Sequence, residues 1–138
     1  MLAFTTRIPL AVMIAMGIKQ YENRAMMPYP TSGKCAMTCS KSSDEREYTN
    51  FLVWAEHVFP AEVYVALPTW EQVADWRGKL IATCNYNASY NPGPLIWNEG
   101  YKVWWHLTNV QMLDEPIPCR GNVGMWELQQ SEKKSPLS

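Results

Sequence analysis

Residues 8–18, IPLAVMIAMGI, are apolar on every side of the helix that they predict, and this constrains the fold more than any other feature. Pro9 suits the first turn of such a helix, and Gly17 suits its C-terminal cap. Eleven apolar residues are too few to cross a bilayer, which takes about 20. Because the helix has no polar face, we expect it to be buried, with the rest of the chain packed around it.

Length and charge indicate one globular domain over residues 1–130, followed by a flexible polar tail at 131–138. The chain has 138 residues, of which 47% are hydrophobic, so it can build a substantial core. Its 12 Lys and Arg are balanced by 13 Asp and Glu, and it has no basic run. A protein that grips a long duplex normally carries excess positive charge. A nucleic-acid partner would therefore be met in a small local pocket.

The four cysteines predict thiols rather than a metal site or disulfides. Cys35 and Cys39 lie on one predicted strand, where four residues span roughly 13 Å. That separation is too large for a shared disulfide or a shared metal ion. With Cys84 and Cys119 they are interpreted as reduced, mostly buried thiols of a cytoplasmic protein. We expect no metal, no cofactor and no membrane association.

The remaining pattern predicts short strands with few helices. An amphipathic helix is expected at 43–58, with a capping box formed by Ser42 and Glu45, and a short helix at 69–76. Residues 60–68 are interpreted as a partly extended connector. Because helices do not alternate regularly with strands, the pattern favours an α+β fold, a small mixed β-barrel flanked by helices. Strands are expected at 2–8, 21–26, 34–41, 78–86, 102–113 and 119–128.

Lys19, Glu22 and Arg24 follow directly after the apolar helix. Period-2 alternation places Glu22 and Arg24 on one face of their strand. In a cleft, Arg24 and Lys41 would bind a phosphate or carbonyl, and Glu22 would accept hydrogen bonds from a base edge. A lysine beside an arginine in a partly dry cleft would act as a base or nucleophile. The alternative is that the three charges form an internal salt bridge that braces the fold.

Four stretches resemble the ASCH domain (activating signal cointegrator homology), a branch of the PUA-like superfamily. Residues 17–24, GIKQYENR, are similar to the family's G-x-K-x-x-E-x-R signature, which also follows an apolar helix. Residues 116–121, PIPCRG, resemble its closing P-x-P-x-[RK]-G turn. The similar stretches occur in the family's order and cover most of residues 2–128: 2–24, 32–41, 77–86 and 104–128.

The resemblance implies a PUA-like barrel with a polar cleft at the signature. We accordingly expect a nucleic-acid-binding module for RNA, another single-stranded nucleic acid or a modified nucleoside, because unstacked bases suit such a pocket better than a duplex. Trp104 is the candidate for stacking on a base. The expected ligand-binding residues are Arg7, Lys19, Glu22, Arg24, Ser40, Lys41, Trp104 and Arg120.

Two other functions remain open. Some proteins with this signature are amidohydrolases that remove an acyl group from a modified cytidine, and ribonucleases are also known in the family. Lys19 and Glu22 would then be catalytic, although Glu22 stands where the amidohydrolases have a threonine. The third possibility is a phage or accessory regulator that binds a protein partner. Exposed Trp and Met on the loops at 27–33 and 87–97 would suit that role.

Overall fold

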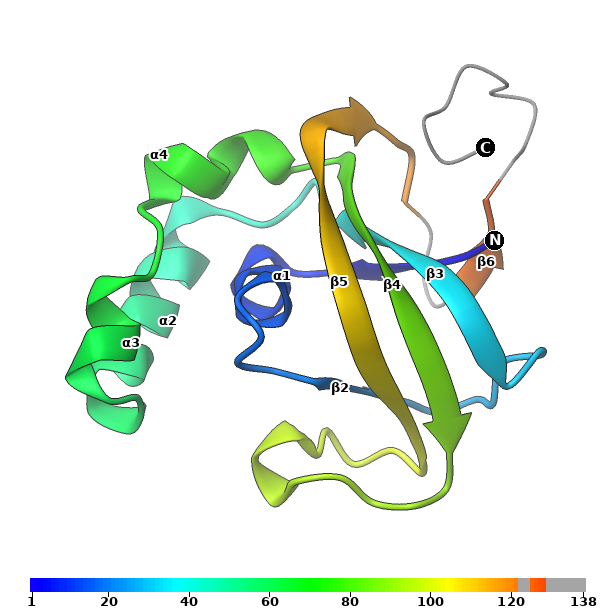
Figure 1. Cartoon of the computed structure of the whole chain (residues 1–138). Helices are drawn as coiled ribbons and strands as arrows, with labels where there is room; N and C mark the ends of the chain where they lie inside the picture. The colour runs from blue at the N-terminus through cyan, green and yellow to red at the C-terminus, as the bar shows by residue number, and fades with distance from the viewer. Residues whose placement is uncertain (122–124, 129–138) are drawn as a thin grey trace.

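The computed structural model describes residues 1–121 and 125–128. Its fold is α+β: a six-stranded mixed sheet curls into a half-barrel, and four α-helices pack with it (Figure 1). Two 3₁₀ turns, Ala74–Trp76 and Leu95–Trp97, lie in the connections. The main elements in chain order are β1 (Leu2–Thr6), α1 (Ile8–Ala15), β2 (Tyr21–Arg24), β3 (Ser32–Cys39), α2 (Glu45–Val58), α3 (Ala61–Val65), α4 (Trp70–Val73), β4 (Lys79–Ser89), β5 (Val103–Pro118) and β6 (Met125–Glu127).

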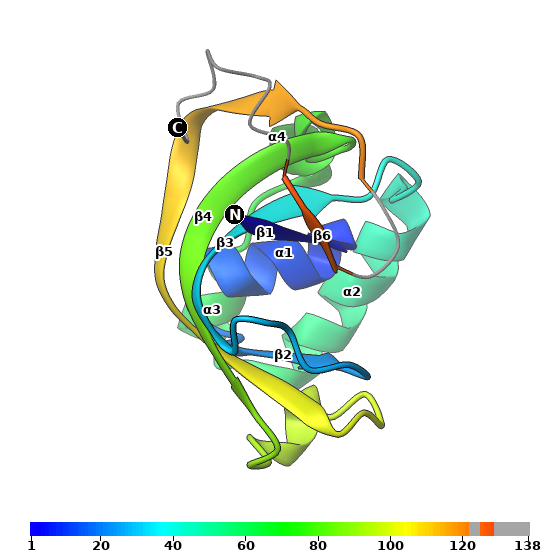
Figure 2. The same cartoon turned by 90° about the vertical axis from the view of Figure 1, so that its right-hand side faces the viewer.

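The strand order across the sheet is β2-β5-β4-β3-β1-β6. β1 and β3 pair in parallel, and the other neighbours pair antiparallel. The two longest strands, β4 and β5, bend strongly, and irregularities in their register interrupt the pairing. Figure 2 shows the sheet wrapped around α1 on its concave side.

α1 is the buried helix that the sequence predicts. It lies between the concave face of the sheet and α2, and its apolar side chains join the main core (Figure 1). Trp105 of β5 is fully buried in the same core, between the rings of Phe4 and Tyr86. The predicted burial of the helix is confirmed, because six of its eight residues are buried, although Leu10 reaches the pocket walls described below.

Both predicted ends of α1 are confirmed. Pro9 occupies the first turn, and Gly17 has a φ of 74°, a left-handed conformation that glycine adopts at little cost. The backbone N–H of Ile8 donates to the Oγ of Ser43, 3.0 Å away. A serine distant in sequence therefore caps α1, and the chain after β3 is fixed against the start of the helix.

The predicted cap of α2 is wrong. The cap is Asp44, whose carboxylate accepts from the backbone N–H of Glu47 at 2.8 Å, and not the expected pair of Ser42 and Glu45. Asp44 lies one residue before the first helical turn, which is where a short acceptor can reach a free N–H. The amphipathic spacing is confirmed, because Tyr48 and other apolar residues on that face are buried.

Several element boundaries differ from the predictions. Residues 60–68, expected to be a partly extended connector, contain the helix α3, which begins directly after Pro60. Residues 114–118, expected to form a turn between the strands 102–113 and 119–128, continue β5, and β4 extends to Ser89 into the loop expected at 87–97. In the predicted strand 119–128, the described residues form a strand only at β6. The tail expected at 131–138 lies outside the described residues.

Strict alternation predicts Leu80, Ala82, Cys84 and Tyr86 on one face of β4, but a register irregularity between Leu80 and Ala82 changes this. Leu80 packs in a smaller cluster with Ala3 and Ala36, whereas Ala82, Cys84 and other β4 residues face the main core. A bulge of this kind adds one residue to one strand and so reverses the alternation beyond it.

No disulfide joins any of the four cysteines, all of which the structure describes, and three of them are buried. Cys35 and Cys84 face each other across β3 and β4, with 3.1 Å between their sulfur atoms. The sequence pattern gave no indication of this pair, because the two residues are 49 positions apart. None of the helices in the described part of the chain is long and apolar enough to span a membrane.

Candidate functional site

Lys19, Glu22 and Arg24 form a connected set of ion pairs. One carboxylate oxygen of Glu22, Oε1, lies 3.1 Å from the Nζ of Lys19, and the other, Oε2, accepts from the Nε and Nη2 of Arg24 at 3.1 and 2.6 Å. Lys19 also donates to the carbonyl of Tyr21, and Arg24 donates to the carbonyl of Thr5. The internal salt bridge that the sequence left as the alternative is therefore present.

These pairs are well shielded from water. The side chain of Lys19 is 1% exposed, that of Glu22 is 4% exposed and that of Arg24 is 17% exposed. Ion pairs are screened least by solvent when they are buried, and a buried charge without a partner is costly. The three residues thus connect the exit of α1, strand β2 and the end of β1.

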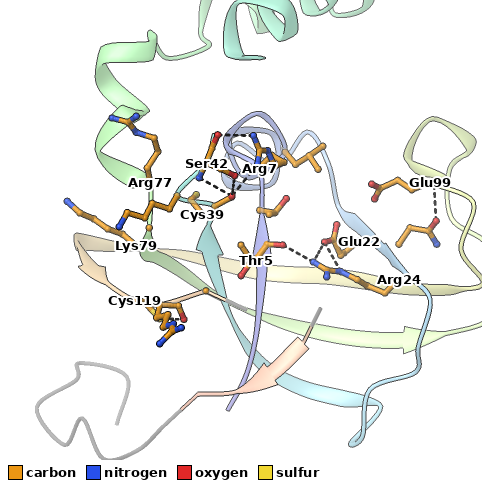
Figure 3. A pocket seen from close by; sticks show the side chains of 18 of the residues that line it. Thr5, Arg7, Glu22, Arg24, Cys39, Ser42, Arg77, Lys79, Glu99 and Cys119 are labelled. Atoms are coloured by element: carbon orange, nitrogen blue, oxygen red, sulfur yellow. Dashed lines mark hydrogen bonds and ion pairs between the residues drawn. The ribbon is translucent and has the colours of Figure 1, made fainter. Parts of the chain in front are cut away.

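A large pocket of about 1360 Å³ opens beside this set of ion pairs. Its walls come from the end of β1, from β2, and from the turns after β3, before β4 and after β5 (Figure 3). Small-molecule sites typically measure about 300–1,000 Å³. The pocket is therefore large enough for more than a small metabolite.

Positive charge is concentrated in this pocket. Six of the chain's 12 Lys and Arg line it, against two of the 13 Asp and Glu. The remainder of the chain keeps six Lys and Arg against 11 Asp and Glu, so the excess of positive charge is local. The charged lining residues are Arg7, Arg24, Lys41, Arg77, Lys79, Arg120, Glu22 and Glu99.

Arg7 is held rigidly at the pocket wall. Its guanidinium contacts both carboxylate oxygens of Glu47, at 2.8 to 3.2 Å, and donates to the hydroxyls of Ser40 and Ser42 at 3.2 and 2.6 Å. The hydrogen bonds to Glu47 raise the pKa of Arg7 above its ordinary value. Arg7 is thus a fixed cation, and the two serines beside it can rotate their hydroxyls toward a ligand.

Two more cations are positioned by local contacts. Lys79 pairs with Asp75 at 2.7 Å. Arg77 lies over the ring of Trp70, 5.3 Å from the ring centroid, and its Nε donates to the carbonyl of Ala74. The terminal nitrogens of Arg77 keep N–H donors for a ligand.

Lys41 and Arg120 remain without such partners. Both side chains are exposed, and neither makes a hydrogen bond or an ion pair with another residue in the described part of the chain. The stem of Lys41 packs beside Gly78, whose φ of 69° turns the chain sharply into β4. These two residues are the cations in the pocket wall most available to an anionic ligand.

The structure places six of the eight predicted ligand-binding residues in the large pocket and two elsewhere. Lys19 lines a smaller pocket of about 290 Å³, and Trp104 lines neither. Trp104 is 5% exposed and packs edge-on against Tyr21, with Gly93 of the preceding β4–β5 loop close to its ring. It is therefore covered at the position where a base would have to stack. The six in the large pocket are Arg7, Glu22, Arg24, Ser40, Lys41 and Arg120.

Glu99 is a pocket residue that the sequence did not reveal. It belongs to the loop between β4 and β5, and in Figure 3 its carboxylate is turned toward Glu22 and Arg24. Partial desolvation at the pocket wall raises the pKa of Glu99, and the nearby charge of Glu22 raises it further. Lys19 and Arg24 oppose that shift. Glu99 makes no side-chain hydrogen bond or ion pair with the described residues.

Asn23 explains why Glu99 has this position. The Oδ1 of Asn23 accepts from the backbone N–H of Glu99 at 2.8 Å and from that of Tyr101 at 3.0 Å. Its Nδ2 donates to the carbonyls of Tyr101 and Val103, both at 2.9 Å. Asn23 is the variable position between Glu22 and Arg24 in the G-x-K-x-x-E-x-R pattern, and only this long-range contact shows its role.

Cys39 also lines the large pocket, but it offers no nucleophile. Burial raises the pKa of its thiol to about 12, so the thiolate is scarce at neutral pH. Within residues 1–121 and 125–128, no three His, Cys, Asp or Glu side chains converge so that they could hold a metal ion. Cys39 therefore contributes no activated sulfur to the pocket.

The raised pKa of Glu99 predicts a pH-dependent effect of Glu99→Gln. Because the folded chain holds the Glu99 proton more tightly than the unfolded chain does, ionisation of Glu99 costs stability. We expect Glu99→Gln to stabilise the fold by less than about 1 kcal/mol at neutral pH and to give no gain well below pH 4.5, the ordinary pKa. Thermal unfolding at the two pH values checks this, with the exposed Glu56→Gln as control. A gain that is equal at both pH values would contradict it.

The chain matches no protein-family model and no curated protein. The resemblance to ASCH domains is therefore one of sequence motifs alone.

Proposed function

We propose that the chain is a nucleic-acid-binding module of the ASCH and PUA-like type, which takes an RNA segment or a single modified nucleotide into the large pocket. The main support for this proposal is that half of all Lys and Arg side chains line one cavity, although the net charge of the chain is −1. Phosphate groups are the common biological anions that such a set of donors suits.

The charge outside the pocket supports a local mode of binding. Acidic side chains outnumber basic ones on the remainder of the chain, so a long duplex lying across the surface would be repelled. A single strand that reaches into the pocket with one or a few nucleotides avoids that repulsion. The volume of the pocket leaves room for a base and its flanking phosphates.

A hydrolase on the same pocket receives less support. The Nζ of Lys19 is held by Glu22 and by the carbonyl of Tyr21, and it lies outside the lining of the large pocket. For a protein-interaction role, the expected exposed Trp and Met are not found on the described loops 27–33 and 87–97, because Met27 and Trp97 are half-buried against the main core. The largely exposed apolar residues there are Tyr29 and Leu95. Exposed apolar residues on loops are common, however, and need no partner.

The proposal is tested by replacing the two unpaired cations. We expect Lys41→Ala/Arg120→Ala to weaken binding of a fluorescent single-stranded RNA by at least about a hundredfold, because the variant removes two charged hydrogen bonds that contribute about 1.5–3 kcal/mol each. The slope of log affinity against log salt concentration should fall by roughly 1.4. Fluorescence anisotropy at several salt concentrations measures both quantities.

The matched control is Lys34→Ala/Arg46→Ala, which removes the same residue types from exposed positions outside the pocket. It should change affinity by less than about threefold. Equal losses in both variants, or no binding of RNA or nucleotides by the wild-type chain, would refute the proposal. Release of acid from acylated cytidine by the wild type, lost in Lys19→Ala, would favour the hydrolase instead.

A further inference from the structure

The large pocket is polarised from one end to the other. Figure 3 shows Arg77 and Lys79 at one end, Glu22 and Glu99 at the opposite end, and Arg7 between them. A ligand that spans the pocket would meet cations at the first end and, at the second, the Glu99 carboxylate beside the ion pair of Glu22 and Arg24. That division fixes a direction for the ligand as well as a site.

Backbone hydrogen bonds build the cationic end. The N–H of Ser40 donates to the carbonyl of Thr6 at 2.9 Å, that of Gly78 to Cys39 at 3.0 Å, and that of Cys119 to Gly78 at 3.0 Å. These bonds join four segments that are distant in sequence. Arg77 and Lys79 flank Gly78, the stem of Lys41 packs beside it, and Arg120 follows Cys119, so these four cations adjoin the same bonded turns.

Of the two carboxylates at the acidic end, that of Glu22 is ion-paired and that of Glu99 is not, among the residues that the structure describes. Both oxygens of Glu22 are already occupied by Lys19 and Arg24, and they brace the fold. The carboxylate of Glu99 has no such partner in the described residues, while its backbone is fixed by Asn23. Glu99 is therefore an acceptor held in place and left open to the pocket.

We propose that the pocket binds a nucleotide unit in one orientation, with its phosphate at Lys41 and Arg120 and the edge of its base at Glu99. Glu99 would then act as the specificity-determining residue, selecting bases that carry an exocyclic amino group. The inference rests on the proposed function and extends it to the class of base. The unit can be a free nucleotide or part of a strand, since both present the same groups.

The selection follows from the chemistry of the base edges. Cytosine, adenine and guanine each present an amino group whose N–H can donate to a carboxylate. Uracil presents one ring N–H flanked by two carbonyl oxygens, whose lone pairs would face the carboxylate. A bound uracil would thus leave Glu99 poorly paired, and an unpaired polar group in a binding site costs affinity.

The test compares cytidine and uridine monophosphates by calorimetry, with cytidine as the ligand that lacks phosphate. We expect the wild type to prefer cytidine monophosphate over uridine monophosphate by roughly tenfold. Glu99→Gln, which keeps the side-chain size, should reduce that preference to within about twofold. The exposed carboxylate variant Glu56→Gln should leave it unchanged.

A second variant separates the two ends of the pocket. Lys41→Ala/Arg120→Ala should weaken both monophosphates alike, bring cytidine monophosphate close to cytidine, and retain the preference for cytosine. The same comparison between cytosine-only and uracil-only RNA strands shows whether the unit is read within a strand. Binding of free monophosphates alone would assign the site to mononucleotides, with the orientation and base preference unchanged.

The failures of the two proposals are distinguishable. If neither RNA nor any nucleotide binds, the proposed function fails and this inference fails with it. If RNA or nucleotides bind and depend on Lys41 and Arg120, but cytosine and uracil bind equally, the inference alone is overturned. If Glu99→Gln keeps the preference for cytosine, the inference is also overturned, because Glu99 then does not determine which base binds.

Discussion

Replacing Glu22 with Gln is expected to lower the free energy of unfolding by about 3–5 kcal/mol. The substitution preserves the size of the side chain but removes the charge that joins Lys19 to Arg24. Arg24 can turn toward the pocket, since it is partly exposed. Lys19 cannot, because its side chain is 1% exposed, and it would remain as a buried cation without a counter-charge. Urea denaturation measures the loss.

The control for this result is Glu47→Gln, which removes the carboxylate that pairs with Arg7. Both members of that pair are about one-third or more exposed, so the expected cost is about 1 kcal/mol or less. The double variant Lys19→Met/Glu22→Gln should recover part of the loss, because it removes the stranded charge along with its partner. If Glu22→Gln lowers the free energy of unfolding no more than Glu47→Gln does, the buried ion pairs do not stabilise the fold.

This arrangement shows how far a sequence motif can predict a site. The spacing of Lys19, Glu22 and Arg24 after an apolar helix correctly placed them together, and alternation put Glu22 and Arg24 on one face. The spacing could not show how the charges pair, because that depends on the carbonyls and the shielding that the folded chain provides. The same local pattern is compatible with a ligand-binding cleft and with an internal salt bridge that stabilises the fold.

The fold, like the site, was predictable where local sequence determines the structure and not where distant segments determine it. The buried helix, the amphipathic helix and most strands were predictable, because each has a periodicity that is complete within its own segment. The extension of β5 to Pro118 was missed, since the residues 114–118 include two prolines and two acidic side chains, typical of a turn. Pairing with the start of β4 outweighs that local preference: Lys79 lies opposite Pro118.

The cationic pocket was predictable only in part. Arg7, Lys41 and Arg120 were expected on the motifs, and the structure brings them to one cavity. Arg77 and Lys79 carried no signal, because each looks like an ordinary surface residue until the turn before β4 is seen beside the turns after β3 and β5. Contacts between segments that are distant in sequence produce no periodic pattern in the sequence of either segment.

Asn23→Ala is expected to cost about 2–3 kcal/mol of stability. The side chain of Asn23 uses all four of its hydrogen-bonding positions, two as donor and two as acceptor, on the backbone of the loop that carries Glu99. Alanine would leave those backbone groups without partners beside a residue that is 2% exposed. Asn85→Ala, at an exposed position of β4, should cost less than about 0.5 kcal/mol.

The functional consequence of Asn23→Ala separates the loop from the phosphate end. Freed from Asn23, the backbone at Glu99 and Tyr101 should exchange its amide hydrogens faster, while amides in β3 and β4 keep their protection. Because Glu99 then loses its fixed position, the preference for cytosine should weaken without loss of the affinity that phosphate provides. Retention of that preference with a loosened loop would show that the base is read elsewhere in the pocket, and that Asn23 serves stability alone.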